Sequence, residues 1–169
     1  MKNTKHNLWM ISLAAWFAVS LTACDDEKCD EKYGDQVYFI FGHFYGKCVG
    51  EGCVEMYKLE DGRLYEDDLD HYPDLTTPLE AHWNELPQEK YEAVKDIESE
   101  FPNELYGEAD HVLGIPDGGD WGGIYVEIRY YGDLAPNSGS WLLDKNESNM
   151  SQVYNDFVDK IEEKIALIK

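Results

Sequence analysis

The fold is decided by residues 36–45, Gln36-Val37-Tyr38-Phe39-Ile40-Phe41-Gly42-His43-Phe44-Tyr45. Aromatic and β-branched residues dominate this stretch, and both kinds favour strands. Successive side chains of a strand point to opposite faces. One face carries Val37, Phe39 and Phe41, and the other carries Tyr38, Ile40 and Phe44. A strand that is apolar on both faces is typical of the middle of a sheet that is covered above and below.

Two groups of strands are predicted from here to residue 143. The first is the central strand with a hairpin, in which residues 54–59 run out, Glu60-Asp61-Gly62 turn and residues 63–65 run back. The second group has a short strand at 111–115, a strictly alternating strand at 124–130 and a partner strand at 141–143. Together they predict an antiparallel sheet of about five to six strands in two meanders.

Helices are predicted between the two meanders and at the end of the chain. Thr77-Pro78-Leu79-Glu80 has the pattern of a capping box with Pro at the first helical position. Pro87 interrupts this region, a helix restarts through residues 88–100, and Pro102 ends it. The last helix begins near Ser151, and its apolar stripe is Val153, Phe157, Ile161, Ile165 and Ile168. The predicted fold class is therefore α+β, with helices packed on an antiparallel sheet.

The first residues have the composition of a targeting segment. Lys2 and Lys5 make a basic start, and residues 8–20 are almost wholly apolar. A membrane-spanning helix needs about 20 apolar residues, so this run is short for one. An uncleaved anchor helix is the alternative.

Leu21-Thr22-Ala23-Cys24 follows this apolar run and resembles the lipobox of bacterial lipoproteins. The resemblance implies a signal peptide over residues 1–23, cleavage before Cys24, and lipid such as palmitate on its sulfur and its new amino group. Two or more acyl chains would hold the chain stably on a membrane. Residues 24–35 are then an acidic tether and residues 36–169 a single α+β domain. The covalent lipid is the only cofactor expected.

Acidic residues follow the proposed lipidation site directly, in Asp25-Asp26-Glu27-Lys28-Cys29-Asp30-Glu31. An Asp after the lipidated Cys resembles the inner-membrane retention signal of enterobacteria. A short acidic cluster resembles the signal that sends lipoproteins of Bacteroidota to the outer membrane and cell surface. Because acidic residues occur on both sides of Lys28-Cys29, we favour the outer membrane or the cell surface.

A wider pattern covers residues 41–55, Pro116-Asp117, and Asp120-Trp121-Gly122-Gly123 before a strand. With the terminal amphipathic helix, it resembles small uncharacterised lipoproteins of Bacteroidota. That group supports the sorting argument and carries no activity to transfer.

Cys48 and Cys53 lie in residues 46–53, a stretch with three glycines in eight residues, which is a turn signal. In an oxidising compartment this arrangement predicts a disulfide. A thiol-redox couple or a metal site with His43 are the alternatives. Four residues separate the cysteines, where a redox motif has two, and zinc needs four ligands where only three are local. Cys29 is left over in the tether.

The charge of the chain limits its partners. There are 35 acidic residues against 14 Lys and Arg, a net charge of −21. Nucleic-acid binding needs a basic footprint, so we expect none. A cationic protein or a divalent cation would be attracted. Asp67, Asp68, Asp70 and Asp74 are the candidate calcium ligands, but their spacing does not fit an EF-hand, and turn-forming, solvated acids are the plainer interpretation.

No catalytic residue is predicted. The serines lie in turn or cap contexts without a nucleophile elbow, and the histidines lack metalloprotease spacing. The candidate binding residues are Trp121, Asp117, Asp120 and His43. We therefore expect a non-catalytic, lipid-anchored binding protein of the cell envelope, whose sharper version is an inhibitor or immunity-type protein for a cationic partner. The alternative is an envelope thiol-redox or metal-binding protein that uses Cys48 and Cys53. The sequence makes no prediction of oligomeric state.

Overall fold

The computed structural model describes residues 36–50 and 52–169. The predicted signal peptide 1–23, the lipidation site Cys24 and the acidic tether 24–35 lie outside the described residues, so they stay predictions. Among the helices of the described part, none is long and apolar enough to cross a membrane.

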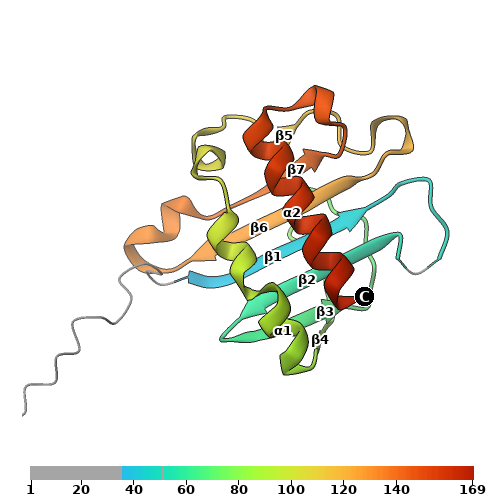
Figure 1. Cartoon of the computed structure of the whole chain (residues 1–169). Helices are drawn as coiled ribbons and strands as arrows, with labels where there is room; N and C mark the ends of the chain where they lie inside the picture. Colours follow the sequence, from blue (N-terminus) through green and yellow to red (C-terminus); the bar gives the residue numbers. More distant parts are fainter. Residues whose placement is uncertain (1–35, 51) are drawn as a thin grey trace, which may run out of the picture. The chain divides into compact units, whose positions relative to one another are not determined.

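Seven strands form one sheet in the order β4-β3-β2-β1-β6-β7-β5 (Figure 1). The strands are β1 (Gln36–Phe44), β2 (Val54–Glu60), β3 (Arg63–Asp67), β4 (Trp83–Glu85), β5 (Val112–Leu113), β6 (Gly123–Tyr130) and β7 (Gly139–Asp144). β1 has three strands on each side, so the predicted central strand is confirmed. The predicted hairpin is confirmed too, because β2 and β3 pair around Asp61 and Gly62, which both have positive φ.

The described helical elements are two α-helices and five short 3₁₀ helices. They are α1 (Gln88–Val94), η1 (Lys95–Glu100), η2 (Asn103–Gly107), η3 (Gly118–Asp120), η4 (Gly132–Asn137), η5 (Glu147–Asn149) and α2 (Gln152–Ile168). The single helix expected over 88–100 is α-helical only to Val94 and continues as η1.

The α+β class is confirmed, but several details were wrong. The sheet has seven strands where five to six were expected, and the second group is no meander, because β5 lies beyond β7. β5 pairs with β7 in parallel, so the sheet is mixed. The sequence 77–80 begins no helix, and the region continues as the edge strand β4. A helix confined between Thr77 and Pro87 would be too short to be stable alone. The edge of β3 offers backbone partners instead, with Leu86 N donating to Leu64 O at 2.8 Å.

α1 and α2 lie on the same face of the sheet, which we call the helix face (Figure 1). Phe39 and Phe41 of β1 are fully buried there. Each such side chain contributes roughly 1.5–3 kcal/mol by leaving water. On α2, Phe157, Ile161, Ile165 and Ile168 are buried as expected, but Val153 is 40% exposed. A row of residues four apart rotates by about 40° per step on a 3.6-residue helix, so Val153 leaves the face.

The opposite side of the sheet, which we call the second face, has a smaller apolar cluster. Its buried members are Ile40, Phe44, Val54, Met56 and Tyr125. The segment between β3 and β4 contributes Leu75 and Leu79, which pack against this cluster. The second face is thus covered by an irregular segment, where the helix face is covered by helices.

Candidate functional site

Asp117 fastens two loops to each other. Its Oδ2 accepts hydrogen bonds from Gly46 N at 2.8 Å and Tyr72 Oη at 3.3 Å, and its Oδ1 accepts one from Gly122 N at 3.2 Å. A Cβ on Gly46 would lie 2.2 Å from Asp117 Oδ2, so this contact requires glycine. The structure therefore gives Asp117, a predicted binding residue, a role in holding the loop after β5 against the β1–β2 hairpin.

Asp120 lies in the same loop and faces the hairpin. Its carboxylate is 3.4 Å from Lys47 Nζ, and both side chains are at least half exposed. Exposed ion pairs of this kind contribute about 0–1 kcal/mol. Asp120 also has φ of 67°, a conformation that Asp tolerates better than most residues. Both observations indicate that Asp120 helps to shape the loop.

Trp121, a candidate binding residue, is exposed. It has 65% of its surface accessible. With Lys145, Asn146, Glu147 and Ser148 it lines a cavity of about 580 Å³. His43 is not among the residues that line this cavity, so the structure does not gather all four predicted binding residues in one place.

Cys48 and Cys53 form the predicted disulfide, with sulfur atoms 2.03 Å apart and Cα atoms 5.5 Å apart. His43 lies under the same hairpin and donates from Nε2 to Gly52 O at 3.2 Å. Burial lowers the pKa of His43, and the nearby positive charge of Lys169 lowers it further. Across residues 36–50 and 52–169, no three His, Cys, Asp or Glu side chains are grouped so as to hold a metal ion.

A long acidic stretch covers part of the second face. Residues 64–89, which we call the acidic run, contain eight Asp and Glu and no Lys or Arg. The run leaves the sheet at the end of β3, passes over the second-face cluster through Leu75 and Leu79, and returns as β4. Negative charge is therefore concentrated on one segment.

The start of the acidic run forms a small cavity, which we call the acidic pocket. It has a volume of about 220 Å³, and the described residues that line it are Gly52, Glu55, Glu66, Asp67, Asp68 and Asp70. None of these is basic. Asp74, the fourth candidate calcium ligand, lies elsewhere and accepts from Thr76 N at 2.7 Å.

Asp67 is the most buried member of the acidic pocket, with only 3% of its surface exposed. Its Oδ1 accepts hydrogen bonds from His82 N at 2.6 Å and Leu69 N at 3.2 Å. Its Oδ2 has no hydrogen-bond partner among the described residues. Buried polar atoms normally have a partner, so this oxygen calls for an explanation.

The neighbours of Asp67 are held by their own partners. Asp68 accepts from His82 Nδ1 at 2.7 Å and from Asn84 Nδ2 at 2.8 Å. These hydrogen bonds, that of Asn84 first, lower the pKa of Asp68. Glu55 Oε2 accepts from Tyr57 Oη at 2.9 Å. The carboxylates are thus positioned by the surrounding protein.

The grouping of Glu55 with the acids of β3 could be inferred from the sequence, but only by aligning two strands of the hairpin. The turn at Glu60-Asp61-Gly62 sets the register of the hairpin, which pairs Tyr57 with Glu66. Continuing that register brings the Glu55 end of β2 beside the Asp67 end of β3. The contribution of Glu55 to the pocket could therefore have been inferred from the hairpin.

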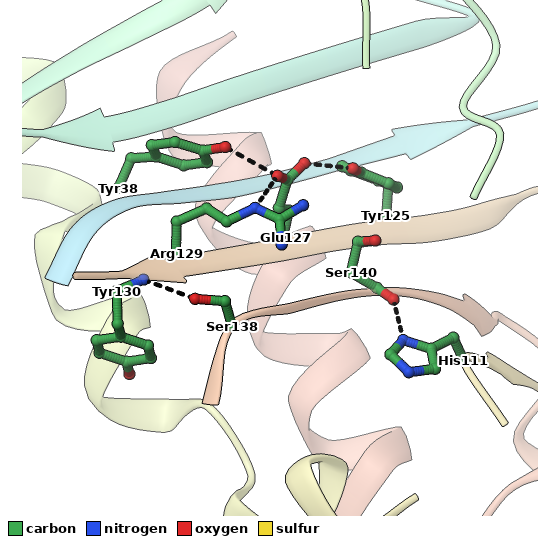
Figure 2. Close-up of polar contacts among 8 residues, drawn as sticks. All are labelled: Tyr38, His111, Tyr125, Glu127, Arg129, Tyr130, Ser138 and Ser140. Carbon is green, nitrogen blue, oxygen red and sulfur yellow. Dashed lines mark hydrogen bonds and ion pairs between the residues drawn. The ribbon is translucent and has the colours of Figure 1, made fainter. Parts of the chain in front are cut away.

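A second polar cluster surrounds Glu127 on the second face, and Figure 2 shows it in front of the strands with α2 behind them. Glu127 is buried and accepts from Tyr125 Oη at 2.5 Å, Tyr38 Oη at 2.9 Å and Arg129 Nε at 2.7 Å. Burial raises the pKa of both tyrosines, and the charge of Glu127 adds to the effect. Both carboxylate oxygens thus have a partner, and the cluster joins β1 to β6.

The Glu127 cluster and the acidic pocket differ in what they leave open. The Glu127 cluster satisfies its carboxylate, whereas the acidic pocket contains a carboxylate oxygen without a partner among the described residues. Comparisons of the chain with protein-family models, with curated proteins and with solved structures find no match. The charge and geometry of the acidic pocket are therefore the best guide to function.

Proposed function

We propose that the chain is a non-catalytic binding protein, anchored to the bacterial cell envelope through lipid on Cys24, that captures a cationic protein. The lipobox resemblance supports the anchor, and the acidic cluster after Cys24 supports the outer membrane or cell surface over the inner membrane. The sharper form of the proposal is an inhibitor or immunity-type protein that neutralises a cationic enzyme or toxin.

The observation that carries this proposal is the acidic pocket. Five carboxylate-bearing residues line one cavity of about 220 Å³ together with a single glycine. Like charges held this close repel one another, and a bound cation relieves the repulsion. The surrounding acidic run adds a negative field that accelerates the approach of a basic surface.

Salt dependence tests the proposal. The full chain is immobilised and exposed to a set of purified, strongly basic proteins, with an acidic protein of similar size as the control. Screening lengths fall from about 30 Å at 0.01 M salt to about 8 Å at 0.15 M. Binding of basic proteins should therefore weaken steeply across this range. Capture that is insensitive to salt, or equal capture of the acidic control, contradicts the proposal.

The alternative function, thiol redox or metal binding by Cys48 and Cys53, is favoured by one observation: Cys48 is exposed, so a reductant can reach the disulfide. Structural disulfides of secreted proteins typically resist reduction at potentials above about −300 mV. We expect mass mapping in glutathione buffers to find Cys48 and Cys53 fully bridged. A pair that is readily reduced, or that binds zinc once reduced, would favour the alternative.

A further inference from the structure

We infer that the cavity beside Trp121 binds a neutral saccharide, with the apolar face of one sugar ring stacked on the indole and the sugar hydroxyls bound by residues 145–148. Trp121 comes from the loop between β5 and β6, whereas residues 145–148 come from the segment between β7 and α2. None of these lining residues belongs to the acidic run. The inference therefore goes beyond the proposed function, because it assigns a second site with an uncharged ligand.

The first reason is that the fold exposes a large aromatic side chain at a fixed position. Trp121 keeps 65% of its surface accessible. Gly119 packs against the pyrrole edge of the ring, since a Cβ there would lie 3.3 Å from both Cδ1 and Nε1. The ends of the loop are joined, because Asp117 N donates to Gly122 O at 2.8 Å and Gly122 N donates to Asp117 Oδ1 at 3.2 Å. The indole is thus an accessible apolar surface on a braced loop, which suits recognition.

The second reason is that one buried carboxylate ties together the two segments that form the cavity. Asp144 has only 1% of its surface exposed. Its Oδ2 accepts from Ile115 N at 2.8 Å in the loop that carries Trp121, and its Oδ1 accepts from Asn146 N at 2.8 Å on the other segment. The cavity of about 580 Å³ is therefore formed before a ligand arrives, so little affinity is lost to ordering it. Its volume lies within the range of about 300–1,000 Å³ that small-molecule sites occupy.

The third reason is the set of polar groups that the cavity offers. Asn146 Oδ1 accepts from Ser148 N at 3.2 Å and Ser148 Oγ at 2.8 Å, while its Nδ2 donates to none of the described residues. The carboxylate of Glu147 has no hydrogen bond or ion pair within the described part of the chain, where only its backbone oxygen is bound. Donors and acceptors thus lie together beside the indole. Each hydroxyl group of a sugar both donates and accepts, so it matches such a mixed set.

The fourth reason is that the cavity suits a neutral ligand better than a charged one. Its described lining contains one Lys and one Glu, whereas the acidic pocket contains five acids and no base. An anion would meet Glu147, and a cation would meet Lys145. A quaternary ammonium ligand is typically bound in a cage of several aromatic rings, but Trp121 is the single aromatic side chain among the described lining residues.

Titration of the full chain with uncharged tetrasaccharides tests the inference. The probes are cellotetraose, maltotetraose, chitotetraose and mannotetraose, which differ in linkage and in hydroxyl stereochemistry, and choline is the cationic comparison. Trp121→Ala removes the aromatic surface. Ile115→Ala is its matched control, because Ile115 is 64% exposed in the same loop and does not line the cavity. Glu147→Gln removes the charge and keeps an acceptor.

We expect calorimetry to detect binding of at least one tetrasaccharide at concentrations up to about 10 mM, which exceeds a Kd of about 1 mM tenfold. Trp121→Ala should weaken this binding about thirtyfold, the loss typical of a tryptophan hot spot. Ile115→Ala should change it less than about twofold, and Glu147→Gln less than about fivefold because an amide oxygen still accepts. The affinity should not depend on salt between about 0.01 M and about 0.15 M, since the ligand is uncharged.

A measurement on the unmodified chain tests the same site without any variant. In NMR spectra, the Nε1–H of Trp121 and the side-chain amide of Asn146 should shift on addition of the saccharide. Shifts confined to other parts of the chain would place the saccharide elsewhere and overturn the inference.

Three further results would overturn it. The first is the absence of binding by all four tetrasaccharides, and the second is an equal loss with Trp121→Ala and Ile115→Ala. The third is binding of choline that disappears in Glu147→Gln, which would assign the cavity to a cation. None of these results bears on the capture of cationic proteins, because that proposal is decided separately by its salt dependence.

Discussion

The two faces of the sheet differ in how many apolar and how many polar side chains they bury. Among the described residues, twenty buried apolar side chains form the cluster of the helix face, against five on the second face. The second face instead holds the buried Glu127 cluster and the middle of the acidic run, which packs on it through Leu75 and Leu79. One face therefore supplies most of the apolar stabilisation, and the other displays charge. Most of the apolar core and the buried Glu127 cluster are thus separated by a single layer of strands.

Adjacent residues of β1 give the largest test of this separation. Phe41 is fully buried on the helix face, with its ring 5.7 Å from that of Tyr57. Ile40 is buried on the second face. Phe41→Ala should lower the free energy of unfolding by about 4 kcal/mol, and Ile40→Ala by about 2 kcal/mol. Urea unfolding measures both. Equal losses would show that the second face stabilises the domain as much as the helix face does.

The Glu127 cluster offers the next test. Glu127→Ala removes the acceptor of three donors and leaves Arg129 without its partner, so we expect a loss of about 3 kcal/mol. Tyr38→Phe removes one hydrogen bond and should cost about 1 kcal/mol. Urea unfolding of both variants, with the charge-matched Glu89→Gln as control, measures the contrast. A higher free energy of unfolding for Glu127→Ala would show that the cluster does not stabilise the domain.

The disulfide gives an intermediate effect. Cys48 and Cys53 close a loop with a sequence separation of 5. On the chain-entropy model such a loop contributes about 2 kcal/mol. The double variant Cys48→Ser, Cys53→Ser should lose this amount in thermal or urea unfolding. An unchanged unfolding midpoint would show that the bridge does not stabilise the fold.

His43 should make stability depend on pH. Burial and Lys169 hold its folded pKa below the ordinary value of 6.5, with Lys145 acting in the same direction and Glu55 against it. The unfolded chain therefore binds the proton more readily, and stability falls as the pH drops below 6.5 until it passes the folded pKa. His43→Gln should flatten this part of the profile between pH 7.5 and 5. An unchanged slope would assign it to other groups.

Trp121 should give the smallest effect on stability. Its side chain is 65% exposed, so Trp121→Ala should change the free energy of unfolding by less than about 0.5 kcal/mol. Differential scanning fluorimetry is sufficient to check this. A larger loss would mean that the cavity beside Lys145 is part of the stabilising structure.

The elements that could be predicted from the sequence are those specified by local patterns. The alternation in β1 and β6, the Asp61-Gly62 turn and the amphipathic α2 each depend on residues close together in the chain. A strand is predicted at the position of β5, but not its parallel pairing with β7. β4 is different, because an edge strand of three residues is chosen by the backbone of its neighbour. That preference leaves no periodic pattern in so short a stretch.

The candidate site was harder to predict for a related reason. Asp117, Asp120 and Trp121 were singled out by residue type, but their roles depend on loops that meet only in the fold. Asp67 was grouped with other acids as a candidate calcium ligand. What distinguishes it is one oxygen without a partner among the described residues, and this depends on the return of His82 fifteen residues later.

The central position of β1 has a consequence for how the chain acquires its structure. β1 pairs with β2 after a short hairpin, but its other edge pairs with β6, in one register from Phe44–Gly123 to Tyr38–Arg129 and with a register shift before Gln36–Tyr130. A β1–β2–β3 meander that forms early therefore exposes a free strand edge until about 60 more residues arrive. Contacts this distant in sequence slow folding, and open edges invite pairing with other chains. Delivery of the whole chain before folding begins would let β6 close that edge first.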